Sequence, residues 1–240
     1  MNKEIQISKR LQMVVGLVTP GKAVADVGCD HAYISIYMLQ HQIASKVIAM
    51  DVNKGPLQRA KENIMKYGYE QVIETRLSDG MERLQAGEVQ TVLIAGMGGP
   101  LMERILTANR AVLQSVEELV LQPQSEIPHV REFMEKIGFQ IEEEAMLQED
   151  GKYYVAWRAS RVSKPEPLGK TIFYEFGKQL LEQQDTTLLQ YLKREIQLQE
   201  SIFEKLQANP TEKSKEKQKE IQKRLTYCKE ALAYYEITGN

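Results

Sequence analysis

Asp26-Val27-Gly28-Cys29-Asp30-His31 closes the first strand-like apolar run of the chain, residues 23–27. A cofactor that lies over the carboxyl end of a strand requires a glycine there, because any Cβ would hold the backbone away from it. The nicotinamide dinucleotide fingerprint needs further glycines two and five positions after its first one, and this chain has Asp30 and Tyr33 at those places. The segment therefore predicts a cofactor loop that does not cradle a pyrophosphate.

The residues that remain in this loop favour a different cofactor. A carboxylate, Asp26, placed just before a single glycine, Gly28, suits the ammonium-bearing tail of S-adenosylmethionine. The alternative is a tight turn from strand to helix that binds no ligand. The loop alone does not separate the two interpretations, so the rest of the chain has to decide.

Outward from this loop, short apolar runs alternate with segments of helical periodicity. The expected strands cover residues 23–27, 46–50, 72–77, 91–95 and 119–121. The expected helices cover residues 5–18, 33–41, 55–67, 100–113 and 126–137. Continuous apolar strands that alternate with helices predict a parallel sheet covered on both faces.

The end of this α/β pattern differs from its beginning. Residues 139–147 and 153–159 are two strand-like runs, and Glu149-Asp150-Gly151-Lys152 between them is typical of a hairpin turn. A Rossmann-like parallel sheet that finishes in an antiparallel C-terminal edge hairpin resembles the class I methyltransferase fold. An all-parallel dinucleotide-binding fold would lack that hairpin.

A second domain is expected after the linker-like segment Lys164–Gly169, which is rich in proline. Apolar residues then recur at the alternating three-four spacing of a coiled-coil seam. They are Leu189, Leu192, Ile196, Phe203 and Leu206, and then Ile221, Leu225, Cys228, Leu232 and Tyr235. The turn signal Asn209-Pro210-Thr211-Glu212 lies between the two sets and predicts an α-helical antiparallel coiled-coil hairpin. We expect a methyltransferase domain over residues 1–163 and the helical hairpin over residues 164–240.

Composition narrows the function classes. The net charge of −2 over 240 residues argues mildly against a nucleic-acid partner without excluding one, because a local basic face can sit on a neutral protein. The longest apolar runs are far too short to cross a bilayer, so no membrane partner is expected. Cys29 and Cys228 lie far apart and form no metal-ligand spacing. They predict free thiols in a cytoplasmic protein that carries no metal.

Two further acids follow expected strands, as Asp26 does. Asp51 ends the second strand, where a carboxylate accepts hydrogen bonds from ribose hydroxyls, although it equally suits the N-cap of the helix that begins at Lys54. Asp79, in Ser78-Asp79-Gly80, follows the third strand, where methyltransferases often have an acid facing the adenine amino group; an Asp-Gly turn is the alternative. Three acids at successive strand ends point to a cofactor pocket more specifically than any one of them.

The fourth strand leads into Ala95-Gly96-Met97-Gly98-Gly99-Pro100. In this fold the methyl group and its acceptor meet here, and amino-group methylases of DNA carry Asn/Asp-Pro-Pro-Tyr at this place. Small residues and bare backbone instead favour an acceptor with its own lone pair, such as an aromatic ring nitrogen, which needs little help from a general base. A purely structural glycine-rich loop is the alternative.

Four motifs together resemble the bacterial TrmK family, the tRNA (adenine-22-N1)-methyltransferases. They are Asp-Val-Gly-Cys-Asp-His-Ala-Tyr (26–33), Ala-Gly-Met-Gly-Gly (95–99), Leu-Gln-Pro (121–123) and Gly-Lys-Tyr-Tyr (151–154). The resemblance covers the architecture of the whole chain, and its motifs lie in residues 8–158. Gln124 departs from the pattern, since many relatives are expected to carry Asn after Leu-Gln-Pro.

The resemblance implies a cofactor pocket for S-adenosylmethionine and, beside it, an acceptor site for a flipped adenine of tRNA. The implied cofactor residues are Asp26, Gly28, Cys29, Asp51, Val52, Asp79, Gly80, Ala95, Gly96, Met97 and Gly98. The residues expected to contact the tRNA substrate are Lys9, Arg10, Gly99, Gln122, Pro123, Gln124 and Tyr153. Asp30, His31 and Tyr33 are expected at the reacting atoms: Asp30 as a charge stabiliser or proton acceptor, and Tyr33 as a stacking partner for the base. His31 equally suits a structural hydrogen bond.

Two alternatives remain open. One is a class I methyltransferase that acts on another RNA or on a small-molecule ring nitrogen. The other is a non-catalytic cofactor-binding module that carries the coiled coil as an interaction arm, although intact acids at all three strand ends argue against such decay. The hairpin can bury its own apolar seam, which favours a monomer.

Overall fold

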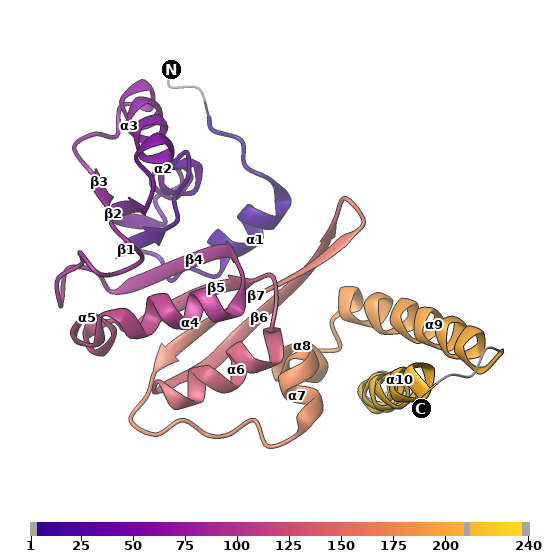
Figure 1. Cartoon of the computed structure of the whole chain (residues 1–240). Coiled ribbons are helices and arrows are strands. Elements are labelled where there is room, and N and C mark those ends of the chain that lie inside the picture. The colour runs from indigo at the N-terminus through magenta and orange to yellow at the C-terminus, as the bar shows by residue number, and fades with distance from the viewer. Residues whose placement is uncertain (1–3, 209–211, 237–240) are drawn as a thin grey trace. The chain divides into compact units, whose positions relative to one another are not determined.

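The structure is a computed structural model that describes residues 4–208 and 212–236 of the chain, in two compact units, residues 1–166 and 167–240. The first unit is built on one sheet of seven strands in the order β3-β2-β1-β4-β5-β7-β6 (Figure 1). The strands are β1 (Lys22–Val27), β2 (Ala44–Asp51), β3 (Ile73–Leu77), β4 (Thr91–Met97), β5 (Glu118–Pro123), β6 (Phe139–Glu149) and β7 (Lys152–Arg161).

The sheet has the mixed character that the sequence predicts. All pairings from β3 to β5 are parallel, while β7 runs antiparallel to both β5 and β6. A parallel sheet with an antiparallel edge hairpin confirms the Rossmann-like methyltransferase fold. The carboxyl ends of β1, β2, β4 and β5 therefore meet at one edge of the sheet, which is where ligands bind in such folds.

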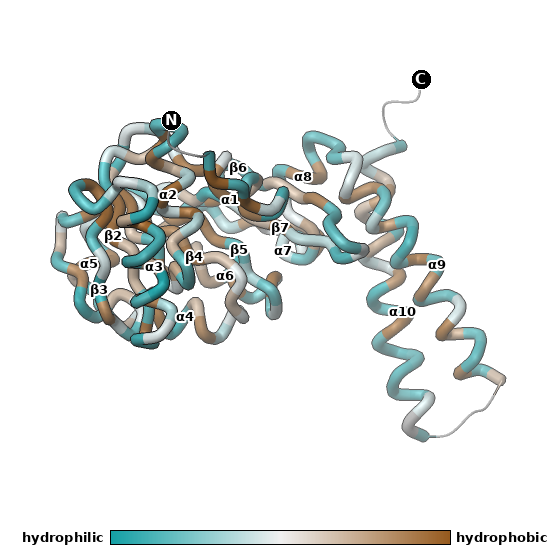
Figure 2. The backbone as a smooth tube through the Cα atoms, turned by 90° about the horizontal axis from the view of Figure 1, so that it is seen from above, coloured by the Kyte–Doolittle hydropathy of each residue, from teal (hydrophilic) through white to brown (hydrophobic). Residues whose placement is uncertain are grey.

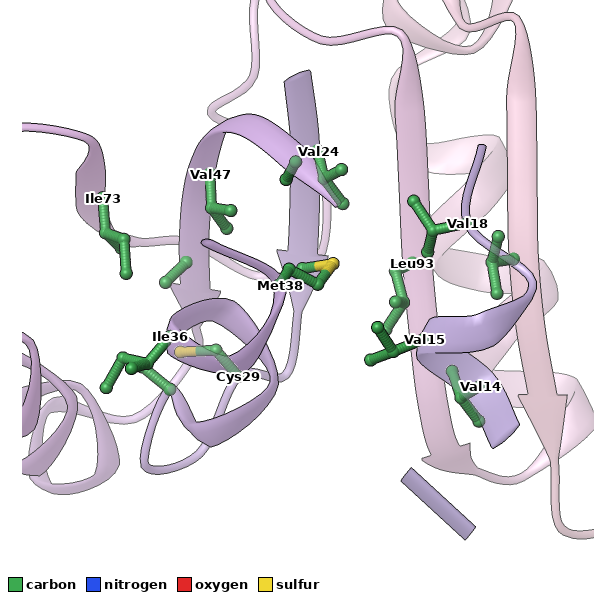
Figure 3. Close-up of a cluster of buried hydrophobic side chains, with 14 of the residues drawn as sticks. Val14, Val15, Val18, Val24, Cys29, Ile36, Met38, Val47, Ile73 and Leu93 are labelled. Atoms are coloured by element: carbon green, nitrogen blue, oxygen red, sulfur yellow. The ribbon is translucent and has the colours of Figure 1, made fainter. Parts of the chain in front are cut away.

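Six helices accompany the sheet in this unit. They are α1 (Lys9–Gly16), α2 (Tyr33–Gln40), α3 (Lys54–Tyr67), α4 (Gly99–Ala108), α5 (Arg110–Ser115) and α6 (Ile127–Lys136). Figure 3 shows side chains of α1 beside Leu93 of β4, and side chains of α2 beside Val24 and Val47 of β1 and β2. Burial of these aliphatic side chains fixes the helices against the sheet and so fixes the loops at its carboxyl edge.

Two expected helices differ from the observed ones. The first begins only at Lys9, where the Ser8 hydroxyl accepts a hydrogen bond from the Leu11 N–H at 3.3 Å. The segment expected as one helix over residues 100–113 breaks at Asn109 into α4 and α5. The Asn109 side chain accepts from the Val112 N–H at 3.3 Å and donates to the Met81 carbonyl at 3.2 Å, so it both caps α5 and ties the break to a neighbouring loop.

The second unit consists of helices only, in the part of it that the structure describes. They are α7 (Thr171–Phe176), α8 (Lys178–Glu182), α9 (Thr186–Ala208), α10 (Glu212–Leu232) and the 3₁₀ turn η1 (Ala233–Tyr235). The chain reverses between α9 and α10, whose hydrophobic and hydrophilic positions alternate along the tube (Figure 2). Leu192, Ile221 and Cys228 of the expected seam are buried. The expected turn residues 209–211 lie outside the described residues, and the short helices α7 and α8 were not expected.

Candidate active site at the carboxyl edge of the sheet

The turn after β1 is fastened to the neighbouring strand. The backbone N–H groups of Gly28 and Cys29 both donate to the Met50 carbonyl of β2, at 2.8 and 2.9 Å. Gly28 has φ +79°, and a Cβ at this position would lie 2.3 Å from the Met97 Cε of β4. The left-handed backbone conformation therefore favours glycine, and any larger residue would also have to displace the flexible end of the Met97 side chain.

Asp26 lies beneath this turn and is almost fully buried, with 2% of its surface exposed. Its Oδ2 accepts a hydrogen bond from the Ser35 hydroxyl of α2 at 2.6 Å. Burial raises the pKa of Asp26 to about 6, although the Ser35 hydrogen bond opposes that rise. Among the described residues no cation lies within ion-pair distance of Asp26. A buried carboxylate of this kind gains most from a ligand that brings its own positive charge.

Asp51 ends β2 and is nearly buried, with Val52 beside it 57% exposed. The Asp51 Oδ1 accepts the Asn53 N–H at 2.8 Å, so the carboxylate closes a short turn. The residue that caps α3 is Asn53, and its side chain makes no capping bond. Asp51 thus holds its own loop and leaves Oδ2 available for a hydroxyl donor.

Asp79 follows β3 in a turn that is held locally. The Ser78 hydroxyl donates to the Gly80 carbonyl at 2.9 Å, and Gly80 has φ +54° with Ile105 packed against it. The Asp79 carboxylate accepts two hydrogen bonds from Arg104 of α4, at 2.9 and 3.0 Å. The Arg104 guanidinium lowers the pKa of this half-exposed acid, so the third acid already has a cation.

The loop after β4 is shaped by glycines against its neighbours. Gly96 has φ +78°, and a Cβ there would lie 3.5 Å from the Arg10 Nη1 and 3.6 Å from the Gln124 Nε2. Gly98 is the N-cap of α4, and at the buried Gly99 a Cβ would lie 2.8 Å from the Ser125 carbonyl oxygen. The bare backbone of this loop therefore faces hydrogen-bond donors on one side and is packed against the β5–α6 loop on the other.

Arg10 links three elements at this edge. Its Nη1 donates to the Gln122 Oε1 of β5 at 2.7 Å, and its guanidinium lies over the Tyr154 ring of β7 at 5.5 Å. The Gln122 amide in turn donates to the Pro123 carbonyl at 3.0 Å. We call Arg10, Gln122, Gln124 and Tyr154 the acceptor-side cluster. Within this cluster, the Arg10 and Gln124 N–H groups lie beside the Cβ position of Gly96, while Gln122 and Tyr154 hold Arg10 in place.

The hairpin between β6 and β7 positions the helix that carries Arg10. The Glu149 carboxylate accepts the Lys9 N–H at 2.8 Å and the Arg10 N–H at 3.4 Å, at the start of α1. A carboxylate at this place satisfies free helix N–H groups and complements the helix dipole. Lys9 itself contributes its backbone here, and its side chain is exposed.

The turn after β1 is bordered by Asp30, His31 and Tyr33. Asp30 has φ +50° and Ala32 φ +59°, a conformation that non-glycine residues adopt rarely and that gathers at functional sites. The His31 and Tyr33 rings stack at 5.4 Å, and the His31 Nε2 lies 3.6 Å from the Asp30 Oδ1. The Asn63 side chain donates to the His31 carbonyl at 3.0 Å and helps to hold the loop. Asp30 and Tyr33 are exposed beside the turn.

Four residues at this edge were missed from the sequence: Ser35, Ser125, Glu149 and Tyr154. Ser35 donates to Asp26, and Glu149 accepts from the first N–H groups of α1. In both cases the two partners lie in different elements, so no spacing in the sequence indicates the contact. Tyr154 contacts Arg10, whereas the expected residue was Tyr153; adjacent residues of a strand point to opposite faces, and the tyrosine pair gives no sign of which one faces the site. Among the described residues, no group of three or more His, Cys, Asp and Glu side chains could hold a metal ion.

Both cysteines are free, as expected, and both are buried. Cys29 lies in the cofactor turn, where burial raises the pKa of its thiol, and burial raises that of Cys228 to about 11. Neither is therefore ionised at neutral pH, so neither is a nucleophile there. Within the part of the chain that the structure describes, no helix has the length and apolar character to span a membrane.

Comparisons with known proteins agree with this geometry. A family model described as a methyltransferase domain matches residues 7–156. The tRNA (adenine(22)-N(1))-methyltransferase of Bacillus subtilis is 35% identical over 95% of this chain and 98% of its own length. The crystal structure of the B. subtilis m1A22 tRNA methyltransferase TrmK has a TM-score of 0.82 at 33% identity, over 95% of this chain and all of that one. The structure of M. capricolum TrmK with S-adenosyl-homocysteine has a TM-score of 0.81 at 26% identity, over 95% and 98% of the two chains.

Proposed function

This chain belongs to the TrmK family of tRNA (adenine-22-N1)-methyltransferases, and we propose that it transfers a methyl group from S-adenosylmethionine to N1 of adenine 22 in tRNA. One observation carries the proposal. A buried carboxylate without a cation, Asp26, lies beneath a glycine turn at the same sheet edge as the acceptor-side cluster. The two halves fit a positively charged cofactor and a planar base, respectively.

The residues of the turn after β1 suit this cofactor. Asp26 would pair with its ammonium group, and the left-handed turn at Gly28 would bring the backbone after β1 close to the cofactor. Asp51, whose Oδ2 is left free by the turn, would accept from the ribose hydroxyls, and the exposed Val52 side chain would pack on the adenine. S-Adenosylmethionine, when bound, supplies a methyl group that is activated by a positively charged sulfur.

The acceptor base needs orientation more than it needs a general base. N1 of adenine has its own lone pair in the neutral ring, but in a folded tRNA the base is stacked or paired and has to be exposed first. Tyr33 offers an exposed aromatic face to hold the exposed base, and Arg10 and Gln124 offer donors to ring nitrogens other than N1, whose lone pair stays free to attack. The product carries a positive charge, and the exposed carboxylate of Asp30 is placed to stabilise it.

We further propose that residues 1–163 carry the catalytic domain and that residues 164–240 form a helical domain that contributes to tRNA binding. The apolar seam of the second unit is shared between α9 and α10, which supports a monomer. A tRNA substrate supports the proposal that the protein is cytoplasmic. Sedimentation of the full-length chain at several concentrations tests the monomer.

The function is tested with labelled S-adenosylmethionine and two tRNA transcripts, one with adenine 22 and one with guanine at that position. We expect 1-methyladenosine in the first transcript and no incorporation in the second. The guanine ring carries a proton on N1 and therefore lacks the lone pair that attacks. Equal incorporation into both transcripts would place the methyl group elsewhere and exclude adenine 22 as the acceptor.

A further inference from the structure

A hollow lies away from the candidate site, near the amino ends of the parallel strands, and is lined by residues of α4, α5, β7 and the end of α6. Figure 1 labels these elements. Its volume is about 420 Å³, and three of the side chains that line it are cations: Arg110, Lys136 and Arg161. Gln114 adds an amide, and none of the lining residues is acidic. A concave surface with one sign of charge concentrates ligands of the opposite sign.

Arg161 is a cation whose charge the surrounding protein does not neutralise. Three residues earlier on the same strand, Arg158 donates to Glu142 at 2.6 Å and to Glu143 at 3.3 Å. Arg161 donates instead to the backbone carbonyls of Leu113 and Val116. In the described part of the chain, no carboxylate lies within ion-pair distance of Arg161.

The pKa values of the two guanidinium groups differ accordingly. Burial lowers the pKa of Arg161. Burial also disfavours the charged form of Arg158, but its two glutamates outweigh that effect and raise the pKa. An anion bound in the hollow would stabilise the charged form of Arg161, as Glu142 and Glu143 stabilise that of Arg158.

Arg110 has no ion-pair partner among the described residues. It is the exposed first residue of α5, where the helix dipole gives a cation no stabilisation, and no carboxylate among the described residues lies within ion-pair distance of it. Lys136 differs, because it ends α6 and pairs with Glu132 at 2.9 Å. The hollow is thus lined by Arg161, which is held by backbone carbonyls, by Arg110, which has no described ion-pair partner, and by Lys136, which is paired with Glu132.

We propose that this hollow binds backbone phosphates of the tRNA substrate, a contact that rests on the proposed function. Guanidinium groups bind phosphate oxygens through two parallel N–H donors, and the Gln114 amide adds a neutral donor. From Glu118 to Pro123, β5 joins the hollow to the acceptor-side cluster over roughly 17 Å, at about 3.3 Å per residue. A tRNA whose target base reaches the carboxyl edge extends well beyond that distance.

The test uses the full-length protein with Arg110→Gln and Lys136→Gln, alone and together, and leaves Arg161 in place because it also caps α5. The affinity for a tRNA transcript is measured across salt concentrations. We expect the double variant to bind tRNA about fivefold to tenfold more weakly at low salt. The slope of log affinity against log salt should fall by about one for each lost contact. KM for tRNA should rise with Kd, whereas kcat and the affinity for S-adenosylmethionine should not change.

The matched control is Lys61→Gln with Lys66→Gln, which removes the same charge from two exposed lysines of α3. If the double variant and the control bind tRNA equally at every salt concentration, the proposal is wrong. A second arm titrates inorganic phosphate against the wild type, observing the arginine side chains by NMR. Phosphate binding that Arg110→Gln removes, together with unchanged tRNA affinity, would assign the hollow to a free anion and overturn the RNA contact. Methylation of adenine 22 by the wild type tests the proposed function separately.

Discussion

Asp26 and Asp79 occupy equivalent places in the sequence pattern but opposite environments in the fold. Each lies at the carboxyl end of a parallel strand of the same sheet, and each is expected to contact the cofactor. Asp26 is buried and accepts hydrogen bonds from Ser35 alone among the groups that lower its pKa, and burial raises that pKa to about 6. Asp79 is half-exposed and paired with Arg104, which lowers its pKa. The position of an acid in a motif therefore indicates where it lies, and its neighbours decide what it can do.

The largest expected effect separates the two acids directly. Asp26→Asn removes the anion beneath the cofactor turn, and we expect kcat/KM to fall by about 100-fold or more, which corresponds to about 2.7 kcal/mol. Calorimetry should show the loss in the affinity for S-adenosylmethionine. Asp79→Asn is the matched control and should cost about threefold or less, because a surface pair contributes little. Equal losses in the two variants would contradict the distinction.

Asp26→Asn should weaken cofactor binding, but it should raise the free energy of unfolding of the cofactor-free protein. Because the folded-state pKa of Asp26 is raised, the folded chain binds more protons than the unfolded chain between about pH 4 and pH 6, so stability is lost as pH rises through that window. Asp26→Asn avoids this loss, and we expect it to be about 2–3 kcal/mol more stable than the wild type at pH 8 and similar to it near pH 4. Urea unfolding without cofactor measures the difference. A pH-independent difference would mean that Asp26 is not buried as an unpaired acid.

The third effect concerns the turn above Asp26. Gly28→Ala places a Cβ against Met97 in a left-handed conformation, which costs about 1–2 kcal/mol of stability, and we expect about tenfold weaker cofactor binding. Gly87→Ala is the control, since Gly87 has φ +80° and nothing within 4 Å of its Cβ position. Thermal unfolding should show a similar loss for both variants, and only Gly28→Ala should weaken the cofactor. Weaker cofactor binding in the Gly87 variant would point to a global effect of stability.

The smallest effect belongs to the exposed pair. Arg104→Gln releases Asp79, whose pKa should return toward its usual value, and we expect the affinity for S-adenosylmethionine to change by about threefold at most. The change should shrink further at high salt, because exposed charges are screened. Calorimetry at low and high salt measures it. A change of tenfold or more would show that Arg104 holds Asp79 in place for the cofactor.

Most of the fold could be predicted because its signals are local. Each parallel strand is a continuous apolar run, and Glu149-Asp150-Gly151-Lys152 marks the hairpin in four consecutive residues. The break at Asn109 could not be predicted, since it depends on carbonyls some 25 to 28 residues earlier in the chain. The helices α7 and α8 were missed for a related reason: they are too short to show a period.

The candidate site likewise has a part that local sequence signals predict and a part that depends on contacts between distant residues. Asp26, Gly28 and Asp51 lie at strand ends that apolar runs reveal, so the cofactor half follows from the sequence pattern and the family resemblance. The pairing of Arg10 with Gln122 spans 112 positions, and only the folded sheet brings them together. The pairing of Asp79 with Arg104 could not be predicted for the same reason, because nothing in the sequence connects two residues that are 25 positions apart.

The hydrogen bonds from α1 to Glu149 also set an order of assembly. The cofactor half draws on residues from Asp26 to Met97, which leave the ribosome before the hairpin has been made. Arg10 is among the first residues synthesised, yet its helix is capped by a carboxylate 139 positions later in the chain. Because such a contact forms only after both partners have been translated, the acceptor side cannot be complete before the β6–β7 hairpin has been synthesised.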